Sequence, residues 1–75
     1  MLTRRYLALL RDVRAGRAEV VCGCVPHLLV DGLHVCDQDA AALVDLVIPA
    51  IPGTVGMQVL ARLTDAGLEA LGVAP

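Results

Sequence analysis

The sequence predicts a small α+β domain that spans residues 1–75 as a single unit. Apolar residues recur at helical spacing near the N-terminus, which is typical of an amphipathic helix. An Asp31-Gly32 pair separates two apolar runs, as a two-residue β-hairpin requires. Farther on, two prolines and two glycines within residues 48–56 separate a second helical pattern from an alternating run typical of a strand. The chain is near the lower size limit for an independent core.

Residues 1–17 are expected to form an Arg-rich amphipathic helix that Thr3 caps. This segment contains five arginines and one aspartate, a net charge of +4, whereas residues 18–75 contain one arginine and seven acidic residues, a net of −6. Charge is therefore segregated along the chain. The arginines form either a phosphate-contacting face or a solvated helix face that pairs with acidic residues of a second subunit.

Residues 18–36 are expected to form strands that include the Asp31-Gly32 hairpin. The hairpin register places Leu29 opposite His34 and His27 opposite Cys36. Thiolates and imidazoles are the ligands that structural zinc prefers, and five such residues lie close in sequence: Cys22, Cys24, His27, His34 and Cys36. Their spacing matches no standard zinc finger or ribbon. The alternative is that the cysteines are small core residues and that no metal or other cofactor is bound.

Residues 37–48 are expected to form a central helix, because their apolar residues again follow helical spacing. Residues 49–63 would form a loop and strand of a β-wing, which the Pro/Gly cluster begins. Residues 64–72 would form a short helix with Thr64 as its N-cap and Leu63 and Leu68 as a hydrophobic staple.

The segment LARLTDAGLEALG, residues 60–72, resembles the end of bacterial winged-helix regulators of the MarR and PadR type. In that family a wing strand runs into an LT-x-x-G-x-x-x-L pattern, which Leu63, Thr64, Gly67 and Leu71 match. The resemblance covers about the C-terminal half. It implies a winged-helix-like order of helix–β-hairpin–helix–β-wing–short helix. It also implies duplex DNA as a partner, and the basic residues available to contact it are Arg4, Arg5, Arg11, Arg14 and Arg62.

Two features depart from the family pattern. The central helix contains aspartates and no basic residue, although the helix before the wing is the one that enters the major groove. Residues 18–36 have strand patterns where the family has a helix. The sequence therefore predicts a non-enzymatic, winged-helix-like binding module of a bacterial or phage regulatory system. The alternative is a protein–protein adaptor or dimerisation module without DNA binding, stabilised by a structural zinc ion.

The composition also predicts a homodimer. The chain is 57% hydrophobic but has one tyrosine and no phenylalanine or tryptophan, so much apolar surface must be buried without large aromatic residues. The alternatives for the interface are the apolar edge of the wing and the apolar side of the first helix, and the residues expected near it are those of the helix: Tyr6, Leu9, Leu10 and Val13. A cytoplasmic location is expected, since no signal peptide is recognisable and Asp45 and the Pro/Gly cluster interrupt the apolar run of residues 40–61. Neither a membrane nor a small-molecule substrate is expected as a partner.

Overall fold

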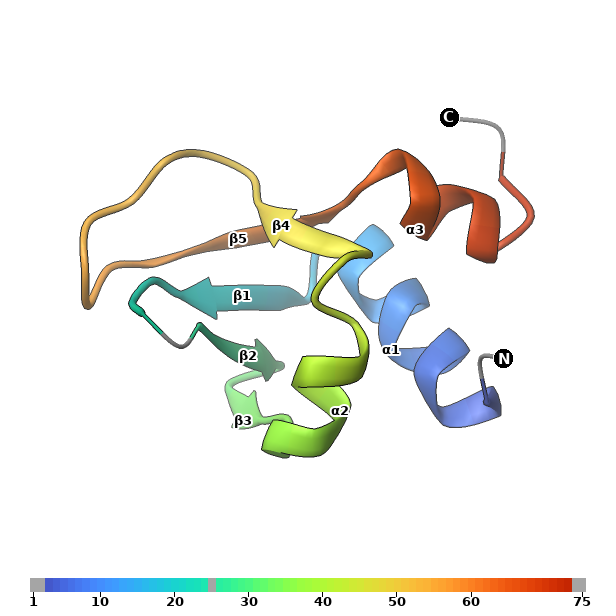
Figure 1. Ribbon diagram of the computed structural model, residues 1–75, viewed down its shortest axis with the longest axis horizontal. Helices are drawn as coiled ribbons and strands as arrows, with labels where there is room; N and C mark the ends of the chain where they lie inside the picture. Colours follow the sequence, from blue (N-terminus) through green and yellow to red (C-terminus); the bar gives the residue numbers. More distant parts are fainter. Residues whose placement is uncertain (1–2, 25, 74–75) are drawn as a thin grey trace.

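The computed structural model describes residues 3–24 and 26–73, which form three helices and one five-stranded antiparallel sheet (Figure 1). The elements in chain order are α1 (Arg4–Arg14), β1 (Ala18–Val21), β2 (His27–Val30), β3 (Leu33–His34), α2 (Asp37–Ala42), β4 (Val47–Pro49), β5 (Gln58–Leu63) and α3 (Asp65–Ala70). The spatial order of the strands is β3-β2-β1-β5-β4. The predicted α+β class is confirmed. The strand expected before the hairpin is present as β1, but the winged-helix order of helix–β-hairpin–helix–β-wing–short helix is not confirmed, because the order of helices and strands differs from it.

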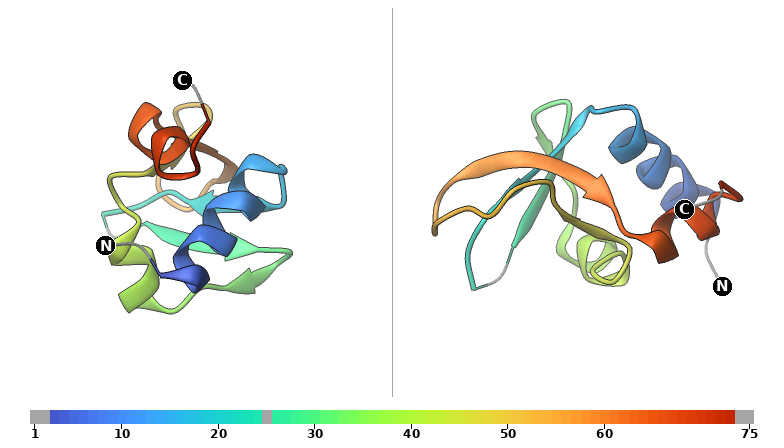
Figure 2. Two further views of the ribbon diagram at one scale, coloured as in Figure 1. Left: turned by 90° about the vertical axis from the view of Figure 1, so that its right-hand side faces the viewer. Right: turned by 90° about the horizontal axis from the view of Figure 1, so that it is seen from above.

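One face of the sheet forms the core. Residues of β5 alternate between exposed and buried, and the buried ones are Val59, Ala61 and Leu63. They pack in one cluster with Leu10 and Val13 of α1. In the right-hand view of Figure 2, the helices lie on one side of strands β1 and β2. Because every second side chain of a strand points away from this core, the opposite face carries Gln58, Leu60 and Arg62 of β5.

Several local predictions are confirmed. The Thr3 hydroxyl accepts a hydrogen bond from the Tyr6 backbone N–H and caps α1. Asp31 and Gly32 both have positive φ angles, 51° and 81°, as a type I′ turn requires. The turn sets the predicted register, which pairs Leu29 with His34.

The end of the central helix was predicted wrongly. Helix α2 ends at Ala42, and residues 43–46 form turns before β4 begins. The apolar periodicity continues through this segment, but its backbone bonds to the end of β5 instead of continuing the helix. The Leu46 carbonyl accepts a hydrogen bond from Thr64 N–H (3.0 Å), and Val47 then pairs with Leu63 of β5. Pairing with β5 therefore replaces the last turns of the expected helix.

Helix α3 is fixed closely to the turn that follows α2. The Thr64 hydroxyl accepts a hydrogen bond from Gly67 N–H (3.1 Å) and donates one to the Asp45 carbonyl (3.0 Å). A Cβ atom at Gly67 would lie 2.4 Å from the Leu46 carbonyl oxygen, so only glycine fits at this position. The LT-x-x-G pattern is thus explained by packing between α3 and residues 45–46.

No helix among residues 3–24 and 26–73 has both the length and the apolar character that crossing a bilayer requires.

Candidate functional site

Three arginines of α1 line its solvent-facing side. Arg4, Arg11 and Arg14 are exposed, and none of them forms an ion pair within the part of the chain that the structure describes. At about 100° per residue, Arg4 and Arg11 fall on the side opposite the buried Val13, and Arg14 lies at the flank of the helix, roughly 100° from Val13. Arg11, Arg14 and Ala15 border a shallow open depression of about 300 Å³. We call these three arginines the arginine stripe. Arg11 and Arg14 also lie in the last turn of α1, where cations interact favourably with the helix dipole.

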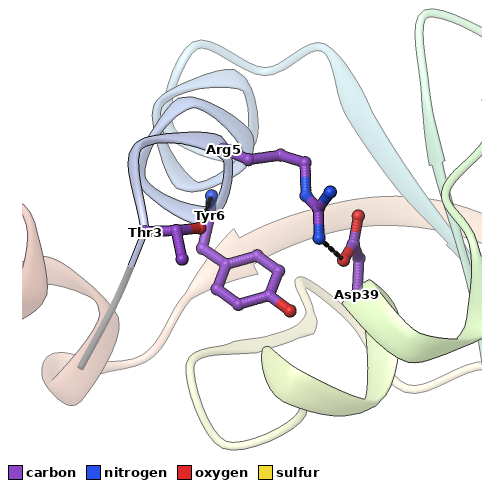
Figure 3. A network of polar contacts seen from close by, with 4 residues as sticks. All are labelled: Thr3, Arg5, Tyr6 and Asp39. Atoms are coloured by element: carbon purple, nitrogen blue, oxygen red, sulfur yellow. Dashed lines mark hydrogen bonds and ion pairs between the residues drawn. The ribbon is translucent and has the colours of Figure 1, made fainter.

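Arg5 belongs to a different network, which joins α1 to α2 (Figure 3). Its guanidinium lies 2.9 Å from the carboxylate of Asp39, the one charged residue that is buried (6% exposed) in the described part of the chain. The Arg5 guanidinium also lies 5.4 Å from the centre of the Tyr6 ring. Contact with Tyr6, followed by the charge of Asp39, raises the pKa of Arg5 above its usual value, so this side chain is charged at every physiological pH. Arg5 therefore links α1 to α2 through its carboxylate partner, unlike the three arginines of the stripe, which have no such partner in the described residues.

The Arg5–Asp39 pair makes a testable prediction. Arg5→Ala should lower the melting temperature by a few degrees, because it leaves a buried carboxylate without its cation. The double variant Arg5→Ala/Asp39→Ala should be more stable than Arg5→Ala alone, since the unpaired charge is then absent. Arg5 is mostly exposed, which keeps the effect modest. Thermal melts of the three proteins measure it, with Arg4→Ala as the unpaired control. A double variant less stable than the single one would contradict this account.

Arg62 lies on a different element from the arginine stripe and on the other face of the sheet. It is exposed on β5 and pairs with Ile48 of β4, whereas its neighbours Ala61 and Leu63 point into the core beneath α1. Arg62 therefore faces away from α1, on the opposite side of the sheet. The five arginines expected to contact DNA do not form one surface, and three of them remain together.

Helix α2 is acidic and short. It has six residues, Asp37 and Asp39 occupy its first turn, and it contains no basic residue. Carboxylates there suit the positive end of the helix dipole. A helix of this length is about 9 Å long, and its charge would repel phosphates. In the structure, as in the sequence, α2 therefore lacks the basic residues that a DNA-recognition helix needs.

The expected zinc ligands do not come together. The rings of His27 and His34 are neighbours, with centroids 5.8 Å apart, as the predicted register implies. Cys36, however, leaves the hairpin and becomes the N-cap of α2. Cys22 lies at the end of β1 against Gly53, and Cys24 is exposed. Among the described residues, no group of three His, Cys, Asp or Glu side chains is placed to hold a metal ion. The five predicted ligands are spread over the segment after β1, the β2–β3 hairpin and the residue before α2.

The expected dimer interface on α1 is also corrected. Leu10 is 0% exposed and Val13 is 2% exposed, because both fill the core of their own chain. Tyr6 and Leu9 are partly buried and pack against the same core. The apolar side of α1 is therefore already occupied, and it offers little to a second copy.

An apolar groove, which sequence reasoning missed, lies between α2 and the sheet. It has a volume of about 310 Å³. Val44 of the turn after α2 lies at this groove and is 60% exposed. The lining comes from β1, β2, α2, β4 and the segments that connect them, and it is mainly apolar: Val20, Leu28, Leu43, Val44, Val47 and Pro49. The sequence signal was Val44, an apolar residue at helical spacing that the shortened α2 leaves outside the core.

Comparisons with protein-family models, with curated proteins and with solved structures found no match for this chain.

Proposed function

We propose that this chain is a non-enzymatic, winged-helix-like binding module of a bacterial or phage regulatory system, and that its arginine stripe contacts the phosphates of duplex DNA. The observation that carries the proposal is the row of Arg4, Arg11 and Arg14 on α1. Exposed arginines clustered along one helix are the electrostatic footprint expected of a nucleic-acid-binding surface.

The arrangement of the C-terminal half supports a winged-helix-like interpretation. Strands β4 and β5 are antiparallel and follow α2, as the two strands of a wing follow their helix. Strand β5 also pairs with β1, the strand that follows the first helix. Helix α3 then follows through Leu63, Thr64 and Gly67. The β2–β3 hairpin is the departure, since it occupies the place of a helix of the family.

The proposed contact uses the backbone of DNA and not the bases. The acidic α2 is unsuited to enter the major groove, so no element of the described chain is offered for base readout. Contacts from arginine to phosphate position a protein on the duplex but carry no sequence information. Binding should therefore be weak, similar on all sequences and strongly dependent on salt.

Titration of a fluorescently labelled duplex at several salt concentrations tests the proposal. Each neutralised phosphate contributes about −0.9 to the slope of log K against log salt, so three arginines predict a slope near −2.7. Arg11→Ala/Arg14→Ala should reduce the magnitude of this slope by about 1.8. Arg62→Ala is the control, because it removes a positive charge from the opposite face of the sheet and should leave the slope unchanged. Binding that is unchanged in the double variant would reject the arginine stripe as the contact surface.

The alternative function is a protein–protein adaptor or dimerisation module that does not bind DNA. The apolar groove beside α2 favours it, because exposed apolar surfaces of this kind are typical of protein–protein contacts. Absence of salt-dependent binding to any duplex, together with self-association, would select this alternative.

A further inference from the structure

The loop between β4 and β5 is an uncharged, apolar projection. Residues 46–61 contain no Asp, Glu, Lys or Arg. We call residues 50–57 the apolar arm, and Figure 1 shows it extending away from the helices. Three of its large side chains are exposed: Ile51, Val55 and Met57. Val55 is the most exposed of the three, at 82%. Small soluble domains rarely present so many apolar side chains on one projection without a partner.

The apolar arm is held in place by contacts with the end of β1. Cys22 N–H donates to the Met57 carbonyl, and Gly56 N–H donates to the Cys22 carbonyl, both over 2.8 Å. Gly53 packs so closely on Cys22 that a Cβ at this position would lie 2.8 Å from the Cys22 sulfur. These contacts present Val55 in a fixed position, which lowers the entropy that a partner must overcome on binding.

The groove beside α2 has matching chemistry. Apart from His27 and Asp37, its lining side chains are apolar or a thiol, and none is lysine or arginine. A charged segment would lose hydration there without gaining a paired charge, except near Asp37. The arginine stripe offers no large apolar side chain to fill such a groove. Among the described surfaces of this chain, the apolar arm is the one that combines exposed apolar side chains with the absence of charge.

Pairing of strands at the β4 edge is a poor alternative. Pro49 has no backbone N–H, and Val47 N–H already donates to the Leu43 carbonyl (3.1 Å). The outward-facing edge of β4 therefore presents carbonyl groups without donors, which blocks the addition of another strand. Association at this end of the molecule must use side chains and not a continuous sheet.

We infer that two copies of this chain form a reciprocal dimer, in which the apolar arm of each copy occupies the groove of the other. A two-fold arrangement satisfies both apolar features at once and leaves no second groove open. A stable interface needs about 800 Å² from each partner, roughly one-sixth of the 4853 Å² surface of this chain. One arm supplies few side chains, so two insertions in one dimer fit this requirement better than one. The inference is independent of DNA binding.

Sedimentation equilibrium at micromolar concentration tests the dimer. The wild type should be dimeric. Val55→Asp in the arm and Val44→Asp at the groove should each weaken the dimer at least 100-fold, because each places a carboxylate in an apolar contact. The matched control is Leu33→Asp, since Leu33 is 74% exposed but lies on β3 at the other edge of the sheet. Circular dichroism verifies that each variant is folded. A monomeric wild type, or a dimer that survives both aspartate variants, would overturn the inference.

A cross-link tests which parts meet. Cys24 lines the groove, so a Val55→Cys chain in a Cys22→Ala/Cys36→Ser background, which removes the other two thiols, should form a covalent dimer with diamide. The thiol introduced at position 55 of one copy and the Cys24 thiol of the other would lose two hydrogen atoms, which reduce diamide to its hydrazine as the disulfide forms. Adding Cys24→Ser should abolish the product, and Leu33→Cys in place of Val55→Cys should give none. A covalent dimer that persists without Cys24 would show that the arm meets another surface.

Discussion

Replacing Leu10 by alanine will lower the free energy of unfolding by about 3–5 kcal/mol. Leu10 is fully buried and, with Leu43, is one of the two largest side chains that the fold hides completely. It lies at the contact between α1 and the sheet, in one cluster with Val20, Val59 and Ala61. This core contains no phenylalanine or tryptophan that could move into the space left by leucine. The cavity should therefore stay largely open, which places the loss at the upper end of the usual range.

Urea unfolding followed by circular dichroism measures this loss. Leu33→Ala removes the same atoms from an exposed site and should change stability by less than about 0.5 kcal/mol. Natural domains have about 5–15 kcal/mol of stability in total, and a 75-residue chain is expected near the lower end. Leu10→Ala should thus remove most of the stability, and Leu10→Asp should unfold the chain. A loss below about 1 kcal/mol for Leu10→Ala would mean that α1 packs differently.

The parts of the fold that the sequence predicted correctly depend on local backbone chemistry. The Asp31-Gly32 turn needs two positive φ angles and no contact with the rest of the chain. Thr3 and Thr64 cap helices through hydrogen bonds to residues three positions ahead. Exposed and buried side chains alternate along β5 because the strand has one face on the core and one face away from it. The alternation of residues in the sequence indicates this directly.

The length of α2 was not predictable by the same means. Leu43, Val44 and Val47 continue the helical spacing of Ala40, so periodicity alone favours a helix to residue 48. The observed end depends on Thr64, which is 18 residues beyond Leu46 in sequence and bonds to its carbonyl. Tertiary hydrogen bonds of this kind override the weak propensity of individual residues. Val44 is consequently exposed beside the groove and not packed in a helix.

The candidate site was predictable in its residue types but not in its geometry. The sequence showed that α1 is rich in arginine, but the ion pair of Arg5 with Asp39 and the outward face of Arg62 depend on how helices and strands pack. The hairpin register correctly placed His27 near His34. It wrongly extended the pairing to His27 and Cys36, because β3 ends at His34 and Cys36 is the N-cap residue of α2. Local patterns thus identified candidate groups, and packing decided which of them share a surface.

Replacing Gly67 by alanine will destabilise the domain by about 2–3 kcal/mol, although alanine is the better helix former. The Cβ would lie 2.4 Å from the Leu46 carbonyl oxygen, and both groups belong to the backbone. Leu46 cannot retreat easily, because its carbonyl also accepts the hydrogen bond from Thr64 N–H. Relief therefore requires α3 to move away from the turn after α2, which would break the Thr64 hydroxyl bond to the Asp45 carbonyl.

Thermal unfolding separates this packing effect from the ordinary cost of changing a glycine. Gly16→Ala is the matched control: Gly16 has a φ of 80° but no atom near its missing Cβ, so alanine there costs only about 1–2 kcal/mol of backbone strain. Gly67 is a helical glycine without positive φ, so all of its loss must come from the contact with Leu46. For a domain of this size, 2–3 kcal/mol corresponds to a fall of roughly 10–20 °C in the melting temperature. If Gly67→Ala melts at or above the temperature of the wild type, α3 does not pack on residues 45–46, and the LT-x-x-G pattern requires another explanation.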